Sequence, residues 1–113
     1  MTADDYIAIA KKYGISYYSL YADTEICYMM PGTCWYMAKY YTDQKEMRNA
    51  VTFHYDNRAK RIIPDQWNSY ERTISPTDFE KKVKKMLVAI KTAENNEELK
   101  KISEDFAWLL LIE

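Results

Sequence analysis

The side chains best suited to chemistry in this 113-residue chain are one histidine and two cysteines, and their spacing assembles no site. His54 is the only histidine, whereas a zinc site needs several converging ligands. The spacing of Cys27 and Cys34 is neither Cys-x-x-Cys nor a zinc-finger pattern. A Cys34–His54 nucleophile pair would need neighbouring strands, and no basic flank lowers the thiol pKa. We therefore predict no catalytic, metal-binding or cofactor-binding residues.

Carboxylates are abundant but do not form an acid–base site. Asp4-Asp5 and Glu97-Glu98 suit the positive end of a helix, and nothing apolar surrounds them to raise a carboxyl pKa. Only two glycines occur, Gly14 and Gly32, which is too few for a loop that cradles phosphate. Because no catalytic motif is present, we predict that the protein is not an enzyme.

A run of four lysines is the strongest charged feature. Their spacing in a helix places them opposite Phe79, Val83 and Met86, so a solvated outer face is the simplest interpretation. Contact with phosphate groups is the alternative, and it would involve Lys81, Lys82, Lys84 and Lys85.

Tyrosine is the most distinctive residue type. Eleven occur in the chain, and ten of them fall between Tyr6 and Tyr55. Tyrosine suits positions where one end of the side chain is packed and the other stays wet, as at binding surfaces. This density favours a binding function over a chemical one.

Composition predicts one globular domain spanning residues 1–113. Hydrophobic residues make up 48% and charged residues 29%, which argues against disorder. The net charge of −1 provides no general attraction to nucleic acid or to an anionic membrane. An acidic start and the lack of a long apolar run argue against a signal peptide and a membrane span. We therefore expect a cytoplasmic chain with reduced thiols.

Local signals predict a first helix and then a series of strands. Thr2 can cap a helix over residues 3–13, and Gly14 suits its end. Turn residues then separate short segments rich in aromatic and β-branched residues. The expected strands are 25–30, 34–41 and 47–55, with a short edge strand at 60–63. Residues 16–22 could be strand or helical turn, and 64–75 read as a loop pinned by Trp67 and Tyr70.

The C-terminal third predicts two helices. Ser75 can cap a helix that begins at Pro76. A first apolar stripe comprises Phe79, Val83, Met86, Leu87 and Ile90, and a second comprises Leu99, Ile102, Phe106 and Leu109. Asn95-Asn96 lies between them and predicts a break. The expected fold is α+β: an N-terminal helix, a three- to four-stranded antiparallel meander and a C-terminal helical hairpin.

Pro31-Gly32 suits a two-residue type II turn. A hairpin closed by it would place Met29 opposite Cys34 and Tyr28 opposite Trp35. Cys27 and Cys34 would then be diagonal neighbours about 7–8 Å apart, too far for a relaxed disulfide. The turn therefore predicts free thiols.

The same hairpin would carry apolar side chains on both faces, although antiparallel sheets usually have one polar face. Either the N-terminal helix and the Trp67 loop cover the second face, or this face is exposed to bind a partner. The residues expected at a partner surface are Tyr17, Tyr18, Tyr28, Met30, Trp35, Met37 and Tyr41.

These features favour a non-enzymatic protein-binding module. In size and expected order of elements it resembles small phage-encoded inhibitors, including certain anti-CRISPR proteins with a helix, three strands and two helices. The resemblance implies a host enzyme or defence complex as partner. A homodimer through the exposed sheet face is a variant. The alternatives are a nucleic-acid binder that stacks bases on Tyr28, Trp35 or Phe53, and a protein with a small-ligand pocket.

Overall fold

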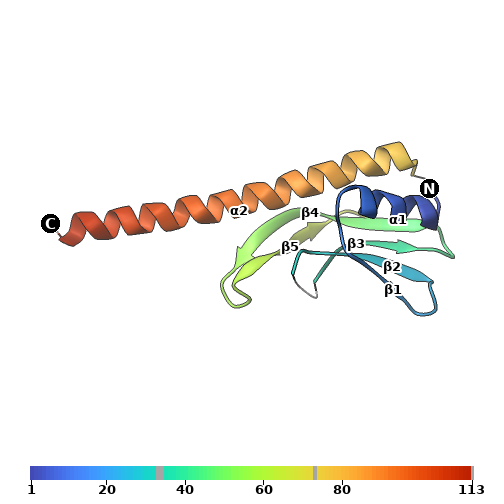
Figure 1. The fold of residues 1–113 in the computed structure, drawn as a ribbon, viewed down its shortest axis with the longest axis horizontal. Helices are drawn as coiled ribbons and strands as arrows, with labels where there is room; N and C mark the ends of the chain where they lie inside the picture. The colour runs from blue at the N-terminus through green and yellow to red at the C-terminus, as the bar shows by residue number, and fades with distance from the viewer. Residues whose placement is uncertain (33–34, 73, 113) are drawn as a thin grey trace.

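The computed structural model describes residues 1–32, 35–72 and 74–112, and side chains as far as residue 107. A helix, a curved antiparallel sheet and a second, long helix follow one another along the chain (Figure 1). The α+β class is as expected. The elements are α1 (Ala3–Lys12), β1 (Tyr17–Leu20), β2 (Glu25–Met29), β3 (Tyr36–Tyr41), β4 (Glu46–Asp56), β5 (Arg61–Trp67), β6 (Glu71–Arg72) and α2 (Pro76–Ile112).

The first helix forms where the capping signals predict it. Thr2 accepts a hydrogen bond from the Asp5 backbone, and the Asp5 carboxylate accepts one from the Thr2 backbone, which completes a capping box. Gly14 then adopts a φ of +67°, a conformation that glycine reaches without steric cost. Tyr6 and Ala10 are buried on the face toward the sheet.

The sheet has more strands than predicted. Strands β1 to β5 are neighbours in chain order, and β6 pairs with the first part of β4. The undecided segment 16–22 contains β1. The expected edge strand at 60–63 is present as the first part of β5, which continues to Trp67. The rest of β5 and the short β6 lie in the segment 64–75 that was expected to be a loop. Pro64, Asp65 and Gln66 hid the second part of β5 in the sequence. Pro64 is tolerated there because β5 is an edge strand with only β4 as neighbour.

The helical hairpin was a wrong prediction, because α2 runs unbroken from Pro76 to Ile112. Asparagine inside a helix costs only about 0.7 kcal/mol relative to alanine, which cannot end a helix by itself. No glycine or proline follows Pro76 to terminate it. The helix therefore extends past the sheet, and the molecule measures 63 × 26 × 24 Å (Figure 1).

The predicted register of the second hairpin was also wrong. Tyr28 lies opposite Ala38 instead of Trp35, and Met29 lies opposite Tyr36 after an irregularity in the pairing. The backbone N–H of Met30 donates to the carbonyl of Trp35 at 2.9 Å, so the loop is longer than two residues. Cys34 lies outside the described residues, and the predicted Cys27–Cys34 geometry with it.

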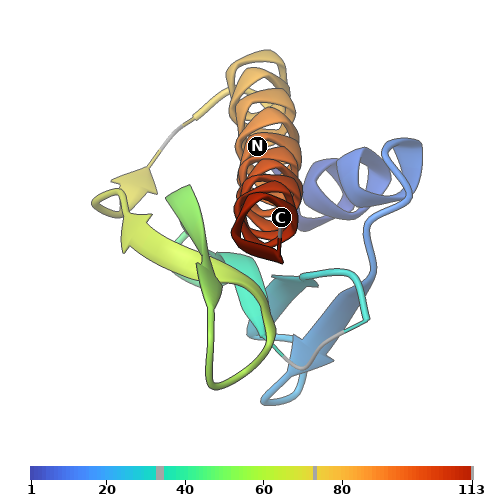
Figure 2. The same ribbon diagram turned by 90° about the vertical axis from the view of Figure 1, so that its left-hand side faces the viewer.

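Both helices pack on the same face of the sheet (Figure 2). The core between them is aromatic. The Tyr6 ring stacks on Tyr28 with a centroid distance of 4.1 Å, and Tyr40 and Phe79 each lie 5.2 Å from Tyr6. All four side chains are almost fully buried. Three of the eleven tyrosines therefore form part of the core.

Candidate functional site: an aromatic surface on the open face of the sheet

The face of the sheet opposite the helices carries alternating aromatic and charged side chains. Because side chains alternate along a strand, residues next to the core positions Tyr28, Tyr40 and Met47 point to this second face. Strand pairing sets them in two rows across the sheet. One row is Tyr18, Cys27, Lys39 and Arg48, and the other is Leu20, Glu25, Tyr41, Glu46 and Arg72.

Lys39 is the first organising cation of this face. Its Nζ lies 2.7 Å from Oε1 of Glu25, and Glu25 is only 7% exposed. The ammonium also lies over the Tyr36 ring at 4.4 Å from the centroid. Burial of the ammonium opposes the charged form, but hydrogen bonds to Glu25 and Tyr36 outweigh it and raise the pKa of Lys39. Lys39 therefore stays charged and holds Tyr36 in place.

Arg48 is the second organising cation. Its guanidinium carbon lies 5.0 Å from the Trp67 ring centre and 5.4 Å from that of Tyr70. The Nε atom of Arg48 is buried and has no hydrogen-bond partner. Hydrogen bonds from Tyr41 and Arg48 lower the pKa of Tyr70, and the same Tyr41–Tyr70 bond raises the pKa of Tyr41. Arg48 thus joins β4 to the segment that follows β5.

A hollow of about 360 Å³ opens beside these cations, lined by Trp35, Tyr36, Pro64 and Trp67. Trp35 is 44% exposed and Tyr36 is 39% exposed, so both present ring surface to solvent. The Tyr36 and Trp67 rings pack at 5.4 Å between centroids. We call these four residues the aromatic hollow. Rings fixed in this way offer a large contact area with little conformational entropy to lose.

The structure divides the predicted partner-binding residues into two groups. Trp35 lines the aromatic hollow, and Tyr18 is exposed on the same face. The ring centroid of Tyr41 lies 5.7 Å from that of Tyr70. Tyr17 is half-buried, on the helix side of the sheet.

Three predicted contact residues were wrong, because Tyr28, Met30 and Met37 are buried in the core. The incorrect register put Tyr28 and Met30 on one face with Trp35 and Tyr41, whereas Met37 lies at the irregularity between the pairs Tyr28–Ala38 and Met29–Tyr36.

Sequence reasoning missed Tyr36, Arg48 and Pro64 as site residues. Trp67 and Tyr70 were expected to pin a loop to the body, and they do pack on it, against Tyr36 and Arg48. Alternation along β4 places Arg48 on the face opposite the core residue Met47. Alternation along β3 alone would place Tyr36 on the core face with Ala38, and the irregularity in the pairing of β2 with β3 turns it to the open face. Pro64 comes close to them only through the pairing of β5 with β4.

Of the residues first considered for chemistry, the structure describes His54 and Cys27, and each has its own acidic neighbour. Nδ1 of His54 lies 3.8 Å from the exposed carboxylate of Asp65, a weak contact on the surface. Burial, and then the charge of Glu25, raises the pKa of the Cys27 thiol to about 11, the reverse of nucleophile activation. Cys34 lies outside the described residues. In the described part of the chain no cluster of ligand residues could hold a metal ion.

No helix among the described residues has the length and apolar character needed to cross a membrane.

The four lysines of α2 do not act as one group. Nζ of Lys82 lies 2.8 Å from Glu71, whereas Lys81, Lys84 and Lys85 are exposed. Phe79 and Val83 turn the other side of this helix toward the sheet. Lys82 and Lys85 line a shallow hollow with Ala50 of β4, and none of the four lysines is among the residues that line the aromatic hollow.

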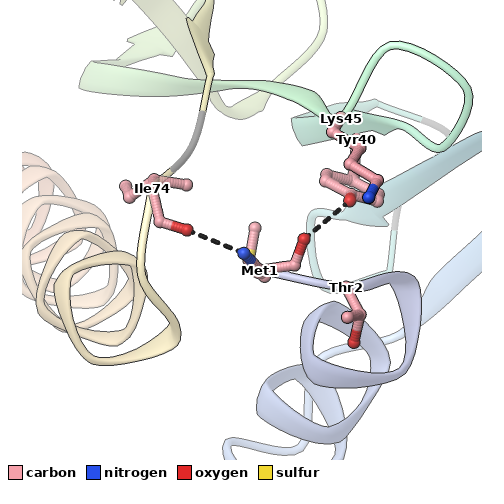
Figure 3. A pocket seen from close by; sticks show the side chains of 5 residues that line it. All are labelled: Met1, Thr2, Tyr40, Lys45 and Ile74. Atoms are coloured by element: carbon pink, nitrogen blue, oxygen red, sulfur yellow. Dashed lines mark hydrogen bonds between the residues drawn. The ribbon is translucent and has the colours of Figure 1, made fainter.

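A second hollow, of about 320 Å³, surrounds the first residues of the chain (Figure 3). The amino group of Met1 donates to the Ile74 carbonyl at 2.9 Å, and the Tyr40 hydroxyl donates to the Met1 carbonyl at 2.9 Å. These bonds link the segment before α1 to the segment before α2. Thr2 and Lys45 complete the lining of this hollow.

Fold and site together define a small α+β fold with exposed aromatic side chains on the sheet face opposite the helices. Comparison with family models, with curated proteins and with solved structures finds no match for this chain. The functional argument therefore rests on the surface itself.

Proposed function

We propose that this chain is a non-enzymatic protein-binding module that holds a segment of a partner protein in the aromatic hollow. The observation that supports this is the pair of solvent-facing rings, Trp35 and Tyr36, beside a hollow on the face that neither helix covers. Tryptophan, tyrosine and arginine are the residues that most often dominate binding energy at protein interfaces. All three types meet here.

The chemistry of the hollow specifies the kind of segment. Its lining is aromatic and prolyl, so it suits a partner's apolar or prolyl side chain packed flat on the rings. Arg48 lies against Trp67 with a buried, unpartnered Nε. A carboxylate of the partner that reached Arg48 would satisfy this donor. We therefore propose an extended segment that combines an apolar or prolyl residue with a nearby acidic one.

An inhibitor carried by a phage or mobile element, of the anti-CRISPR or another anti-defence type, is the narrower form of this proposal. The structure keeps the initial helix and an antiparallel sheet, but the sheet has six strands instead of three or four and one helix replaces the helical hairpin. Binding to a host defence protein in the cytoplasm would use the same surface. A buried, reduced Cys27 suits that compartment.

Selection from a displayed peptide library on the immobilised protein tests the proposal. We expect enriched peptides to carry an apolar or prolyl residue near an acidic one, and to quench or shift tryptophan fluorescence. Trp35→Ala should weaken their binding by about tenfold or more, the loss typical of a central interface residue. Tyr21→Ala is the matched control, because Tyr21 is 76% exposed in the β1–β2 turn, at the other end of β2. Selection that yields only peptides indifferent to Trp35→Ala would reject the hollow as the site.

Nucleic-acid binding is the second candidate, and it predicts a different result. Of its proposed stacking residues, Tyr28 is fully buried and Phe53 packs partly against the core, which leaves Trp35. A filter-binding titration at two salt concentrations separates the candidates: submicromolar binding that weakens steeply with salt would favour nucleic acid. A small-ligand pocket is the third candidate, since the hollow lies at the lower end of the usual volume range for such sites.

A further inference from the structure

Helix α2 carries two apolar stripes on opposite sides. Phe79, Val83, Met86 and Ile90 are buried against the sheet. Val88, Leu99, Ile102 and Phe106 are each between 61% and 65% exposed. From Ile90 to Leu99 the helix makes about two and a half turns, so the second stripe faces away from the sheet.

The second stripe cannot be covered by the body of the same chain. On the sheet side, Ala93, Glu97 and Lys100 line a hollow with Phe53 and Tyr55 of β4. The stripe runs along the other side of the same helix, and Figure 1 shows α2 continuing beyond the sheet with nothing above it. An exposed apolar stripe of this length on a helix typically marks a contact with another molecule.

A column of charges identifies the occupant. Lys84, Lys91, Glu98 and Asp105 follow one another at seven-residue intervals along one edge of the stripe, and all four are exposed. Seven-residue spacing keeps residues on one line of a helix pair. The order of signs is two positive and then two negative. Such a column is complementary to a copy of itself that runs in the opposite direction.

We propose that α2 pairs with α2 of a second copy of this chain, antiparallel, through the stripe that contains Val88, Leu99, Ile102 and Phe106. In this arrangement Lys84 faces Asp105 of the second copy, and Lys91 faces Glu98 of the second copy. The two-fold axis repeats both pairs. A parallel arrangement would bring no opposite charges of this column together.

The same register sets the apolar contacts. Val88 lies opposite Leu99 of the second copy, and Thr92 lies opposite Asn95, which places a polar layer at the centre. A buried asparagine of this kind fixes register and orientation in helix pairs. Ile102 and Phe106 lie opposite the aliphatic stems of Lys85 and Lys81, whose ammonium groups can stay in water. Each body lies on the far side of its own helix, so the sheets do not collide.

A membrane surface fits the stripe less well than a second copy does. Residues 91–112 contain three lysines and five acids, a net charge of −2, whereas residues 76–90 contain four lysines and two acids, a net charge of +2. Helices that lie on anionic lipid are rich in lysine and arginine beside the apolar face. Here the acidic half of the helix carries most of the exposed apolar residues, and the basic half of another copy complements it.

Sedimentation equilibrium with charge-reversed variants tests this proposal, which does not depend on the proposed partner of the aromatic hollow. The full chain should be dimeric at micromolar concentration. Two variants reverse half of the charge column. Lys84→Glu/Lys91→Glu makes the column entirely acidic, and Glu98→Lys/Asp105→Lys makes it entirely basic. Each should weaken self-association by roughly tenfold or more, since four attractive pairs become repulsive. An equimolar mixture of the two variants should form a heterodimer. A chain that carries all four substitutions should form a homodimer again.

The control variant Lys11→Glu/Arg58→Glu makes the same change in net charge as Lys84→Glu/Lys91→Glu, at exposed positions outside α2, and it should dimerise like the unmodified chain. Circular dichroism should be unchanged in every variant, because all the substituted side chains are exposed. A monomeric full chain, or a monomer that binds anionic vesicles through α2, would overturn the proposal. If neither charge-reversed variant weakens self-association, the antiparallel arrangement is wrong.

Discussion

At the residue scale, tyrosines from the same tyrosine-rich segment of the sequence have opposite roles, in the core and on the surface. Tyr28 stacks on Tyr6 in the core, and its hydroxyl donates to the Tyr6 carbonyl. Tyr36 lies on the open face beneath the ammonium of Lys39. Burial decides between the two roles, and burial follows from the strand register. Substitutions at these positions should therefore separate stability from binding.

Tyr28→Ala should lower the free energy of unfolding by about 3–5 kcal/mol, the cost of removing a large aromatic side chain from a core. Tyr28→Phe should cost about 1 kcal/mol, because only the hydrogen bond to the Tyr6 carbonyl is lost. Tyr21→Ala, on an exposed residue, should stay within about 0.5 kcal/mol. Urea unfolding measures all three changes. A small loss for Tyr28→Ala would mean that Tyr28 belongs to the open face after all.

The Cys27 thiol should react slowly with thiol reagents near neutral pH. Its pKa is raised to about 11, first by burial and then by the charge of Glu25. Because the folded-state pKa lies above the unfolded value, the stability from the neutral thiol is complete below pH 9.0 and is lost as pH rises toward about 11. Alkylation rates in a Cys34→Ser background, measured against pH, check this. Rapid modification of the folded protein at pH 7 would contradict it.

At the element scale, α2 shows why one helix can look like two. Its apolar stripes lie on opposite sides, so the periodic pattern changes phase between Ile90 and Leu99. A change of phase at Asn95-Asn96 resembles a hairpin when only the sequence is read. In the structure the two stripes instead serve two contacts, one with the sheet and one with the proposed second copy.

Asn96→Ala distinguishes one continuous helix from a hairpin. In a continuous helix alanine replaces an exposed, poorer helix former and should raise the free energy of unfolding by up to about 0.7 kcal/mol. In a hairpin, Asn96 could cap the second helix, and its loss would cost about 1 kcal/mol. Thermal or urea unfolding measures the change in the free energy of unfolding, and its sign distinguishes a continuous helix from a hairpin. Asn96 is preferred over Asn95 because Asn95 lies in the proposed helix pair.

At the scale of the whole molecule, the long helix makes the protein elongated. The Cα radius of gyration is 17.2 Å, whereas a compact chain of this length would have about 13 Å. A helix end that projects from a small body gains little from intramolecular packing. Pairing with a second copy would give this projecting segment the contacts that the body cannot supply.

Small-angle scattering should detect this shape. The monomeric variant Lys84→Glu/Lys91→Glu should give a radius of gyration near 17.2 Å, close to that of the Cα trace. A value near the compact expectation of about 13 Å would mean that the end of α2 folds back as a hairpin. The same measurement on the control variant Lys11→Glu/Arg58→Glu should report the larger dimer.

Local signals in the sequence determined the features that depend on near neighbours. Thr2, Asp5 and Gly14 specify the bounds of α1 through hydrogen bonds and backbone conformation within a few residues. Alternation predicted most of β4, and Ser75-Pro76 predicted the start of α2, where Ser75 accepts a hydrogen bond from the Asp78 backbone at 3.1 Å. The class of fold follows from these elements.

Tertiary structure alone decided which tyrosines are buried and where the surface lies. The register of β2 on β3 depends on a loop longer than Pro31-Gly32 suggests, and a shift in register changes which side chains share a face. The second part of β5 depends on its pairing with β4, because Pro64, Asp65 and Gln66 give no strand signal of their own. The aromatic hollow joins Trp35 and Tyr36 to Pro64 and Trp67, and only that long-range pairing brings them together.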